Sequence, residues 1–265
     1  MKTILKTSSG LKQILMIGVF SLAALLFNSY SVNAQQRIKN IVLVHGAFAD
    51  GSSWKAIYDI LSKKGFHVSI VQNPLSSLKD DVAATKSVLN MQDGPAILVG
   101  HSWGGAVISE AGVHTKVAGL VYVAAFAPDK GETAGQWIGA APAAPEAGFT
   151  AADEFGLVYF EPSKFHGGFA ADLSQVQSDF MATSQVPIKV HSFEEAIENV
   201  AWKTKPTYGI VATQDKALHP DTERKMYQRA GAKITEIKGS HVIFISKPQA
   251  VANVIIEAAQ NSLYK

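Results

Sequence analysis

The stretch Pro95-Ala96-Ile97-Leu98-Val99-Gly100-His101-Ser102-Trp103-Gly104-Gly105 decides the fold of this chain. Its apolar run, residues 96–99, predicts a buried strand, and the mostly small residues of 105–113 favour a helix. Between them, Gly-His-Ser-Trp-Gly matches the Gly-x-Ser-x-Gly pattern of a strained turn that presents a serine hydroxyl above a sheet. The flanking glycines fit this turn because a Cβ would collide where strand and helix approach. We therefore interpret Ser102 as a candidate nucleophile; the alternative is a glycine-rich turn with an idle serine.

Strands and helices alternate on both sides of this turn. Short apolar or β-branched runs predict strands at 40–44, 67–71, 96–99, 117–124, 207–212 and 233–237. Helices are predicted at 54–64, 78–91, 105–113, 220–230 and 247–261. Strands that alternate with helices in this way form right-handed βαβ units. We therefore expect an α/β fold whose mostly parallel central sheet carries helices on both faces.

The alternation stops between residues 129 and 205. Residues 140–152 are rich in alanine, proline and glycine, and no buried strand is expected before Pro206. Helical pieces are predicted at 174–184 and 193–200. Because long structureless loops are uncommon in compact domains, we interpret 129–205 as a lid inserted into a core made of 35–128 and 206–265.

The first 34 residues resemble a signal peptide. Lys2, Lys6 and Lys12 form a basic start, residues 14–27 are apolar, and Val-Asn-Ala at 32–34 supplies small residues for cleavage. We expect an exported protein, periplasmic or secreted, that begins near Gln35. The alternative is an uncleaved membrane anchor, for which the apolar run is short.

The composition limits which partners and cofactors we expect for this protein. The chain has 265 residues, 47% of them hydrophobic, which is enough for one large α/β domain. All three basic residues of the leader are lost on cleavage, so the mature chain is close to neutral and neither nucleic acid nor a membrane is expected as partner. The chain contains no cysteine, no glycine-rich phosphate loop and no dinucleotide fingerprint, so we expect no metal and no cofactor. Whether the protein is a homodimer stays open.

Two more polar residues follow the last two predicted strands. Asp215 comes just after the strand over 207–212, and His241 just after the strand over 233–237. Ser102, Asp215 and His241 thus stand in the order Ser, Asp, His at one edge of the sheet, where open α/β sheets bind their ligands. Asp129, after the strand over 117–124, is the alternative acid, and Asp215 as an ordinary loop carboxylate is another. His45 and His101 are interpreted as residues that hold the loops of the site.

These motifs resemble the cofactor-free α/β-hydrolases. The resemblance rests on Leu43-Val44-His45-Gly46-Ala47-Phe48, on the turn at Ser102, on residues 124–129, and on Asp215 and His241 with their neighbours. It is strongest with a bacterial esterase branch similar to the plant methylesterase and hydroxynitrile lyase group, and it covers residues 39–259. The resemblance implies the α/β-hydrolase fold, with the lid inserted after the strand that corresponds to the sixth of larger members.

Together, the motifs and the resemblance predict a serine hydrolase that forms an acyl-enzyme with small-to-medium uncharged carboxylic esters. His241 would take the proton of Ser102, and Asp215 would orient the imidazole. The backbone N–H groups of Trp103 and Ala47 would form the oxyanion hole, with Phe48 as the alternate donor. Hydroxynitrile lyase or perhydrolase-like activity with the same triad is one alternative, and a non-enzymatic ligand receptor is another. The lyases usually add a lid lysine, for which the candidates are Lys164, Lys189 and Lys203.

Overall fold

The computed structural model describes residues 38–262 and builds them around one six-stranded parallel sheet. The strands are β1 (Asn40–Val44), β2 (His67–Val71), β3 (Ala96–His101), β4 (Val117–Val123), β7 (Thr207–Ala212) and β8 (Lys233–Ile237). Their order across the sheet is β2-β1-β3-β4-β7-β8. The four central strands are buried along their whole length, as continuous apolar sequences require.

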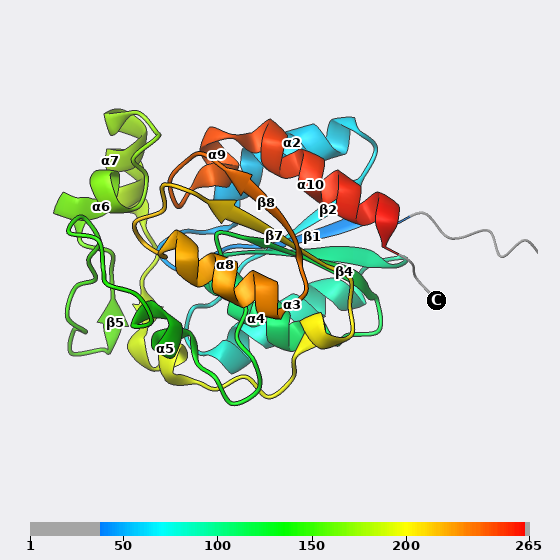
Figure 1. Cartoon of the computed structure of the whole chain (residues 1–265), viewed down its shortest axis with the longest axis horizontal. Coiled ribbons are helices and arrows are strands. Elements are labelled where there is room, and N and C mark those ends of the chain that lie inside the picture. The colour runs from blue at the N-terminus through cyan, green and yellow to red at the C-terminus, as the bar shows by residue number, and fades with distance from the viewer. Residues whose placement is uncertain (1–37, 263–265) are drawn as a thin grey trace, which may run out of the picture. The chain divides into compact units, whose positions relative to one another are not determined.

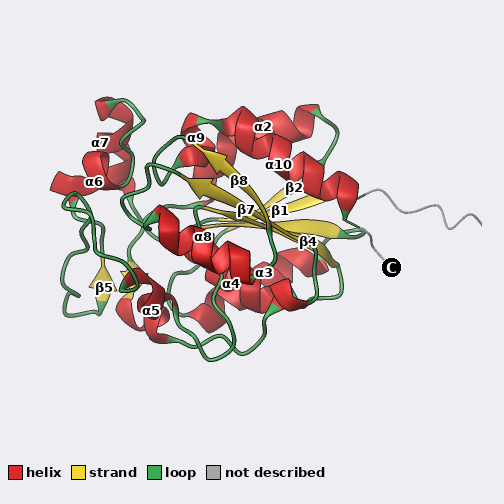
Figure 2. Cartoon of the chain, viewed as in Figure 1, coloured by secondary structure: helices red, strands yellow, loops and turns green. Residues whose placement is uncertain are grey.

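Helices cover both faces of the sheet (Figures 1 and 2). One face carries α2 (Lys55–Lys63), α9 (Ile243–Ser246) and α10 (Pro248–Asn261), which contact one another. The other face carries α3 (Leu78–Asn90), α4 (Trp103–Ala111) and α8 (Pro220–Arg229). The predicted α/β architecture is therefore confirmed.

Element ends differ from the prediction by a few residues. The helix predicted at 54–64 is preceded by a 3-10 turn, η1 (Gly51–Trp54), in which the Asp50 side chain accepts the Ser52 N–H. The helix after Ser102 begins at Trp103, two residues earlier than predicted. The closing helix begins at Pro248, as suits a proline at the first helical position, and the short α9 before it was not predicted.

Between β4 and β7 the chain forms short elements, most of which lie beyond one end of the sheet (Figure 1), while η3 contacts α4. They are α5 (Ala134–Ile138), β5 (Leu157–Val158), α6 (Pro162–Gly168), α7 (Gln175–Ser184), β6 (Ile188–Lys189), η2 (Val190–Glu194) and η3 (Ala201–Lys203). The helix predicted at 174–184 is present as α7, with Ser174 as its N-cap. Strands β5 and β6 pair antiparallel over two residues each, a feature too short to leave a sequence pattern.

The prediction of a helix at 193–200 is wrong. The chain leaves a 3-10 turn at Glu194 and becomes extended at Glu195. Ala196 then forms a β-bridge with Thr133, and the Ile197 N–H donates to the Glu132 carbonyl. These long-range bonds replace the local bonds of a helix. The predicted signal peptide, residues 1–34, lies outside the described residues, and none of the helices within 38–262 is long and apolar enough to cross a membrane.

Candidate active site

Ser102 lies in the turn between β3 and α4 with a φ of 52° and a ψ of −120°. Few residues other than glycine adopt a positive φ, so the turn is strained. The flanking glycines allow it, because a Cβ on Gly100 would lie 2.5 Å from the Gly104 carbonyl oxygen and a Cβ on Gly104 would lie 2.6 Å from that of Val44. The strain follows from a close approach of strand and helix that presents the Ser102 hydroxyl at the carboxyl edge of the sheet.

The structure brings together the three residues that the sequence singled out at this edge. Nε2 of His241 lies 2.8 Å from Oγ of Ser102, and Nδ1 of His241 lies 2.5 Å from Oδ2 of Asp215. Oδ1 of Asp215 accepts the backbone N–H groups of Ala217 and Leu218 at 2.8 and 2.9 Å. All three side chains are buried, with exposures of 8% for Ser102, 4% for Asp215 and 1% for His241. A serine, an imidazole and a carboxylate thus form one continuous hydrogen-bonded chain.

The alternative acid, Asp129, is engaged elsewhere. Its carboxylate pairs with the ammonium group of Lys203 and accepts the N–H of Lys130 at 2.6 Å. Lys203 is one of the three lysines considered for the lyase alternative. The other two are also committed, since Lys164 contacts the Ala147 carbonyl at 3.3 Å and Lys189 donates to the Phe155 carbonyl.

The backbone N–H groups near Ser102 differ in their partners. The N–H of Phe48 donates to the carbonyl of Val186 at 3.1 Å, so it is not free to bind another oxygen. Within residues 38–262, the N–H groups of Ala47 and Trp103 have no hydrogen-bond acceptor, and Ala47 lines the cavity at Ser102. Trp103 is the first residue of α4, where backbone N–H groups and the helix dipole favour negative charge. The geometry therefore favours Ala47 over Phe48 beside Trp103.

Two buried histidines hold the loops of the site. Nε2 of His45 accepts the Asn73 N–H at 2.9 Å while Nδ1 donates to the Gly46 carbonyl at 2.8 Å, and burial lowers the pKa of His45. Nε2 of His101 bonds to the His241 carbonyl at 3.0 Å. Burial first, and then the neighbouring His241, lower the pKa of His101 well below its usual range. Both rings are therefore neutral and act as rigid connectors.

Acidic residues that the sequence analysis did not single out also support the site. Asp172, in the segment between α6 and α7, accepts the Ser240 N–H at 3.0 Å, the Ser240 hydroxyl, and the Ser246 hydroxyl at 2.6 Å. Asp81 and Glu223 are wholly buried. Helical spacing is the signal that could have found them: Asp81 shares the buried face of α3 with Leu78, three residues before it, and Thr85, four residues after it.

The cavity at Ser102 and His241 is small, about 20 Å³, and its other lining residues are apolar. Phe126, Phe149, Phe169 and Phe193 contribute aromatic walls, and the ring of Phe169 lies 4.8 Å from that of His241. A second cavity of about 250 Å³ shares Ile138, Phe149, Ala217 and Leu218 with the first. The two cavities therefore adjoin, with these shared side chains between them.

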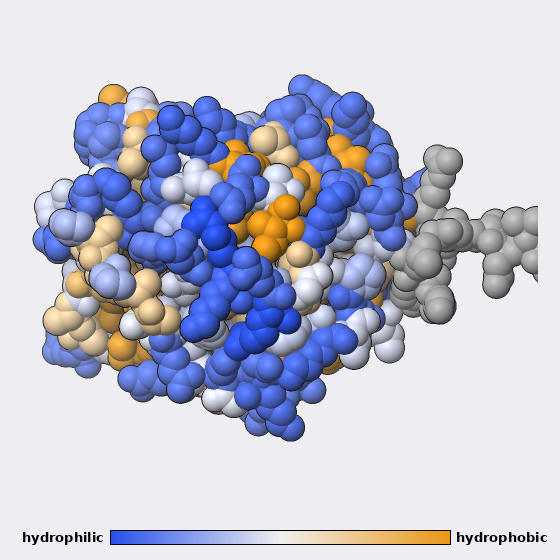
Figure 3. Space-filling view, in the orientation of Figure 1, coloured by the Kyte–Doolittle hydropathy of each residue, from blue (hydrophilic) through white to orange (hydrophobic). Residues whose placement is uncertain are grey.

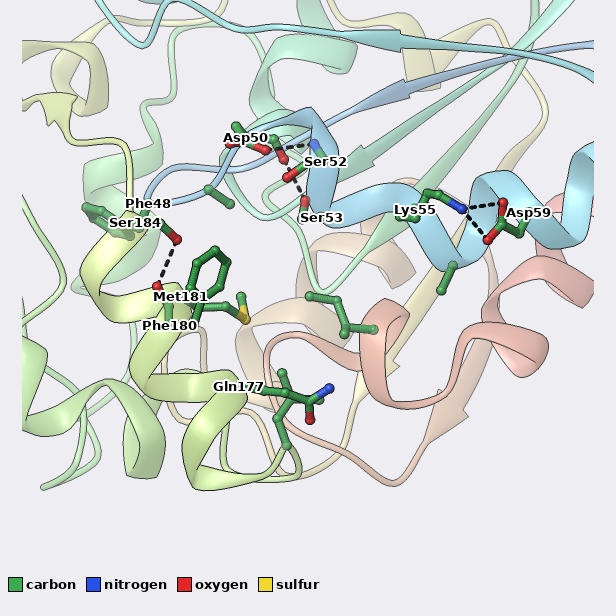
Figure 4. Close-up of a pocket in the computed structure, with 14 residues that line it drawn as sticks. Phe48, Asp50, Ser52, Ser53, Lys55, Asp59, Gln177, Phe180, Met181 and Ser184 are labelled. Carbon is green, nitrogen blue, oxygen red and sulfur yellow. Dashed lines mark hydrogen bonds and ion pairs between the residues drawn. The ribbon is translucent and has the colours of Figure 1, made fainter.

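A larger hollow of about 430 Å³ lies on the other side of Phe48, between α7 and the start of α2 (Figure 4). Phe180 and Met181 of α7 face it from one side, and Lys55 and Asp59 of α2 form an ion pair on the other. It shares only Phe48 with the cavity at Ser102. The face in Figure 3 is largely hydrophilic, and its apolar areas are small and separate.

Comparison with known proteins identifies the family. The model of the "Alpha/beta hydrolase family" matches residues 41–254. The chain belongs to this family. In this alpha/beta hydrolase, no group of three His, Asp or Glu side chains within residues 38–262 is placed to hold a metal ion.

Individual relatives agree with the predicted resemblance. A pyrethroid hydrolase of Sphingobium wenxiniae is 24% identical over 84% of this chain and 88% of its own length. Methylesterase 7 of Arabidopsis thaliana is 28% identical over 83% of this chain and 96% of its own length. Among solved structures, polyneuridine aldehyde esterase superposes with a TM-score of 0.72 at 18% identity, over 83% of this chain and 98% of that one. The predicted relationship to plant methylesterases is confirmed.

Proposed function

We propose that this alpha/beta hydrolase cleaves small-to-medium uncharged carboxylic esters through an acyl-enzyme on Ser102. The observation that carries the proposal is the hydrogen-bonded chain from Ser102 Oγ through the His241 ring to Asp215. A buried serine that contacts an oriented imidazole is the arrangement that nucleophilic acyl transfer requires.

The mechanism follows from this geometry. His241 Nε2 takes the hydroxyl proton as Ser102 Oγ attacks the ester carbonyl, and Asp215 holds the Nδ1–H tautomer and stabilises the imidazolium. The N–H groups of Ala47 and Trp103 bind the oxyanion, each contributing about 3–4 kcal/mol to the transition state. His241 returns the proton to the leaving alcohol. It then activates a water molecule that attacks the acyl carbon and frees Ser102.

The lining of the site supports an uncharged substrate. Apart from Ser102 and His241, the residues around the small cavity are apolar, so a charged group there would lose its hydration without gaining a partner. The adjoining 250 Å³ cavity offers room for a short acyl or alkoxy group once Phe149 or Ile138 moves. Relatives named pyrethroid hydrolase and methylesterase favour the same class of reaction.

The lyase alternative has less support. Lys164, Lys189 and Lys203 are each bonded elsewhere, and within residues 38–262 no lysine lines the cavity at Ser102. Lys216 lines only the adjoining cavity and pairs with Glu146, so the described lysines that line these two cavities offer no free cation of the kind that the resemblance to the lyases would require.

The test is a comparison of kcat/KM for p-nitrophenyl acetate, a long-chain p-nitrophenyl ester and a charged peptide ester, each at two salt concentrations. The proposal predicts that the short ester is preferred and that kcat/KM does not change with salt. Ser102→Ala, run beside the wild type, should abolish turnover of every ester. A preference for the charged ester that weakens as salt rises would contradict the substrate class.

We also propose that the protein is exported, on the basis of the basic start, apolar segment and Val-Asn-Ala site in residues 1–34. Mass spectrometry of the protein recovered from an expressing bacterium tests this. An N-terminus near Gln35 in the periplasmic or culture fraction is expected, and an intact Met1 in the membrane fraction would contradict it.

A further inference from the structure

A second carboxyl group lies behind the acid of the candidate triad. Glu223 is in the first turn of α8, and its side chain has no exposed surface. Its Oε2 accepts the N–H of Ala212, the last residue of β7, at 3.1 Å. Its Oε1 has no donor within residues 38–262. An ionised carboxylate in that position would carry charge into a fully buried site with one of its oxygens unsatisfied, which is unfavourable.

The Asp215 carboxylate is the neighbouring group whose charge acts most on Glu223. Both residues bond to Ala212 at the end of β7, because the Ala212 N–H donates to Glu223 Oε2 and the Asp215 N–H donates to the Ala212 carbonyl at 3.0 Å. Asp215 already accepts two backbone N–H groups and the His241 ring, which stabilise its negative charge. Two carboxylates in contact in a buried site do not both ionise. Burial, and then the charge of Asp215, raise the pKa of Glu223 well above its ordinary value. The proton of the pair therefore resides on Glu223.

We propose that Glu223 is a positioning residue for the triad: as a neutral carboxylic acid, it donates a hydrogen bond from Oε1 to the carboxylate of Asp215. This bond would give Oε1 of Glu223 a hydrogen-bond partner and would hold Asp215 from the side opposite His241. Because α8 holds Glu223 and β7 anchors its Oε2, the orientation of the imidazole would be set by rigid elements. The inference rests on the proposed function, since it assigns Glu223 a role in that same site.

The other ionisable groups near Glu223 do not replace this bond. The phenol of Tyr227 is occupied by the backbone of Ala125, with distances of 2.8 Å to its nitrogen and 3.0 Å to its oxygen. Arg224 lowers the pKa of Glu223 only weakly, because its guanidinium pairs with Asp221 and Glu236 near the surface. Among the charged groups near Glu223, Asp215 therefore has the largest effect on its pKa.

The test compares Glu223→Gln with the wild type in thermal unfolding as a function of pH. A carboxyl group whose pKa is raised on folding contributes most stability below its unfolded value of 4.5, and that contribution is lost as pH rises toward the folded value. Glutamine keeps a donor for Asp215 and an acceptor for Ala212 but cannot ionise. The Tm of the variant minus the Tm of the wild type should therefore increase by about 3 °C per pH unit as the pH rises above about 5 toward the folded-state pKa of Glu223.

Glu236→Gln is the matched control, because Glu236 is on the neighbouring strand β8 and its carboxylate pairs with Arg224 at the surface. The difference in Tm between Glu236→Gln and the wild type should not increase as the pH rises. If the difference in Tm between Glu223→Gln and the wild type stays constant or decreases as the pH rises, the proposal is wrong. This readout needs no substrate, so it is independent of whether the wild type hydrolyses esters.

Kinetics then test the positioning role. Glu223→Gln should retain most of kcat, whereas Glu223→Met, which has similar length but no donor, should lose about tenfold or more in kcat with little change in KM. If the methionine variant and the wild type have equal kcat values, Glu223 does not position the triad, even if the wild type is an esterase. If Glu223→Met does not fold, the unfolding profile of Glu223→Gln still decides whether Glu223 carries the proton.

Discussion

The indole Nε1 of Trp103 donates a hydrogen bond of 2.7 Å to the carboxylate of Asp81, which has no exposed surface. The second oxygen of that carboxylate accepts the N–H of Leu75 at 2.8 Å. Burial raises the pKa of Asp81 to about 6, so the group is ionised at neutral pH and both bonds are charge-assisted. Through this contact, α3 fixes the residue whose backbone N–H is proposed to bind the oxyanion.

Asp81→Asn should lower kcat at pH 7.5 by about tenfold or more with little change in KM, because asparagine offers one acceptor oxygen where two donors need one each. Steady-state kinetics on p-nitrophenyl acetate measures the effect. Asp80→Asn changes the adjacent, exposed carboxylate, which bonds only near its own helix start, and should leave kcat unaltered. Equal kcat values for the two variants would show that Trp103 is held without Asp81.

Asp172→Ala should slow turnover by about threefold to tenfold, because it removes three hydrogen bonds that join the segment between α6 and α7 to Ser240, next to His241, and to Ser246 of α9. Asp179→Ala, on the exposed side of α7, is the control and should behave as the wild type. The measurement is kcat at saturating ester. An unchanged kcat in Asp172→Ala would mean that the loop keeps His241 in place without the hydrogen bonds of Asp172.

Asp215→Asn should reduce kcat by roughly 10⁴-fold with little change in fold, since an amide favours the wrong tautomer of His241. Asp129→Asn should retain activity, because the Asp129 carboxylate pairs with Lys203. Single-turnover kinetics with circular dichroism on both variants separates loss of chemistry from loss of fold. If Asp129→Asn were the crippled variant, the assignment of the acid would be wrong.

Phe149→Ala should widen the range of esters accepted. Phe149 lines both the cavity at Ser102 and the adjoining cavity, so its removal joins the two spaces. The kcat/KM for p-nitrophenyl butanoate or hexanoate, divided by the kcat/KM for p-nitrophenyl acetate, should rise by about tenfold. Phe155→Ala is the control, since Phe155 is 66% exposed and lines neither cavity. An unchanged ratio would place the acyl group elsewhere.

The sheet and the reactive residues could be predicted because their signals are local. Four apolar runs buried on both faces predict the central strands, and the Ser, Asp, His order at strand ends predicts which side chains meet. The segment between β4 and β7 could not be predicted in detail, because its bonds join distant residues: Ala196 pairs with Thr133, and Val158 with Ile188. Those pairings depend on the folded core, which no local pattern encodes.

The supporting acids escaped prediction for a different reason. Acidic residues on helices are usually solvated, and Asp172 has no pattern that sets it apart. Glu223 does carry a signal, since it stands three and four residues before the buried Met226 and Tyr227 on the inner face of α8. A carboxyl group at such a position indicates a polar partner inside the protein. The choice between Ala47 and Phe48 needed the structure, because the Phe48 N–H is taken by Val186, 138 residues further along the chain.

The central claim is that Ser102 is the nucleophile, and covalent labelling tests it most directly. The folded protein is incubated with a fluorophosphonate, which reacts with an activated serine, and the modified peptide is located by mass spectrometry. The account predicts one adduct, on Ser102, that disappears in Ser102→Ala and forms much more slowly in His241→Ala. An adduct on a different serine, or none on protein shown to be folded, would contradict it.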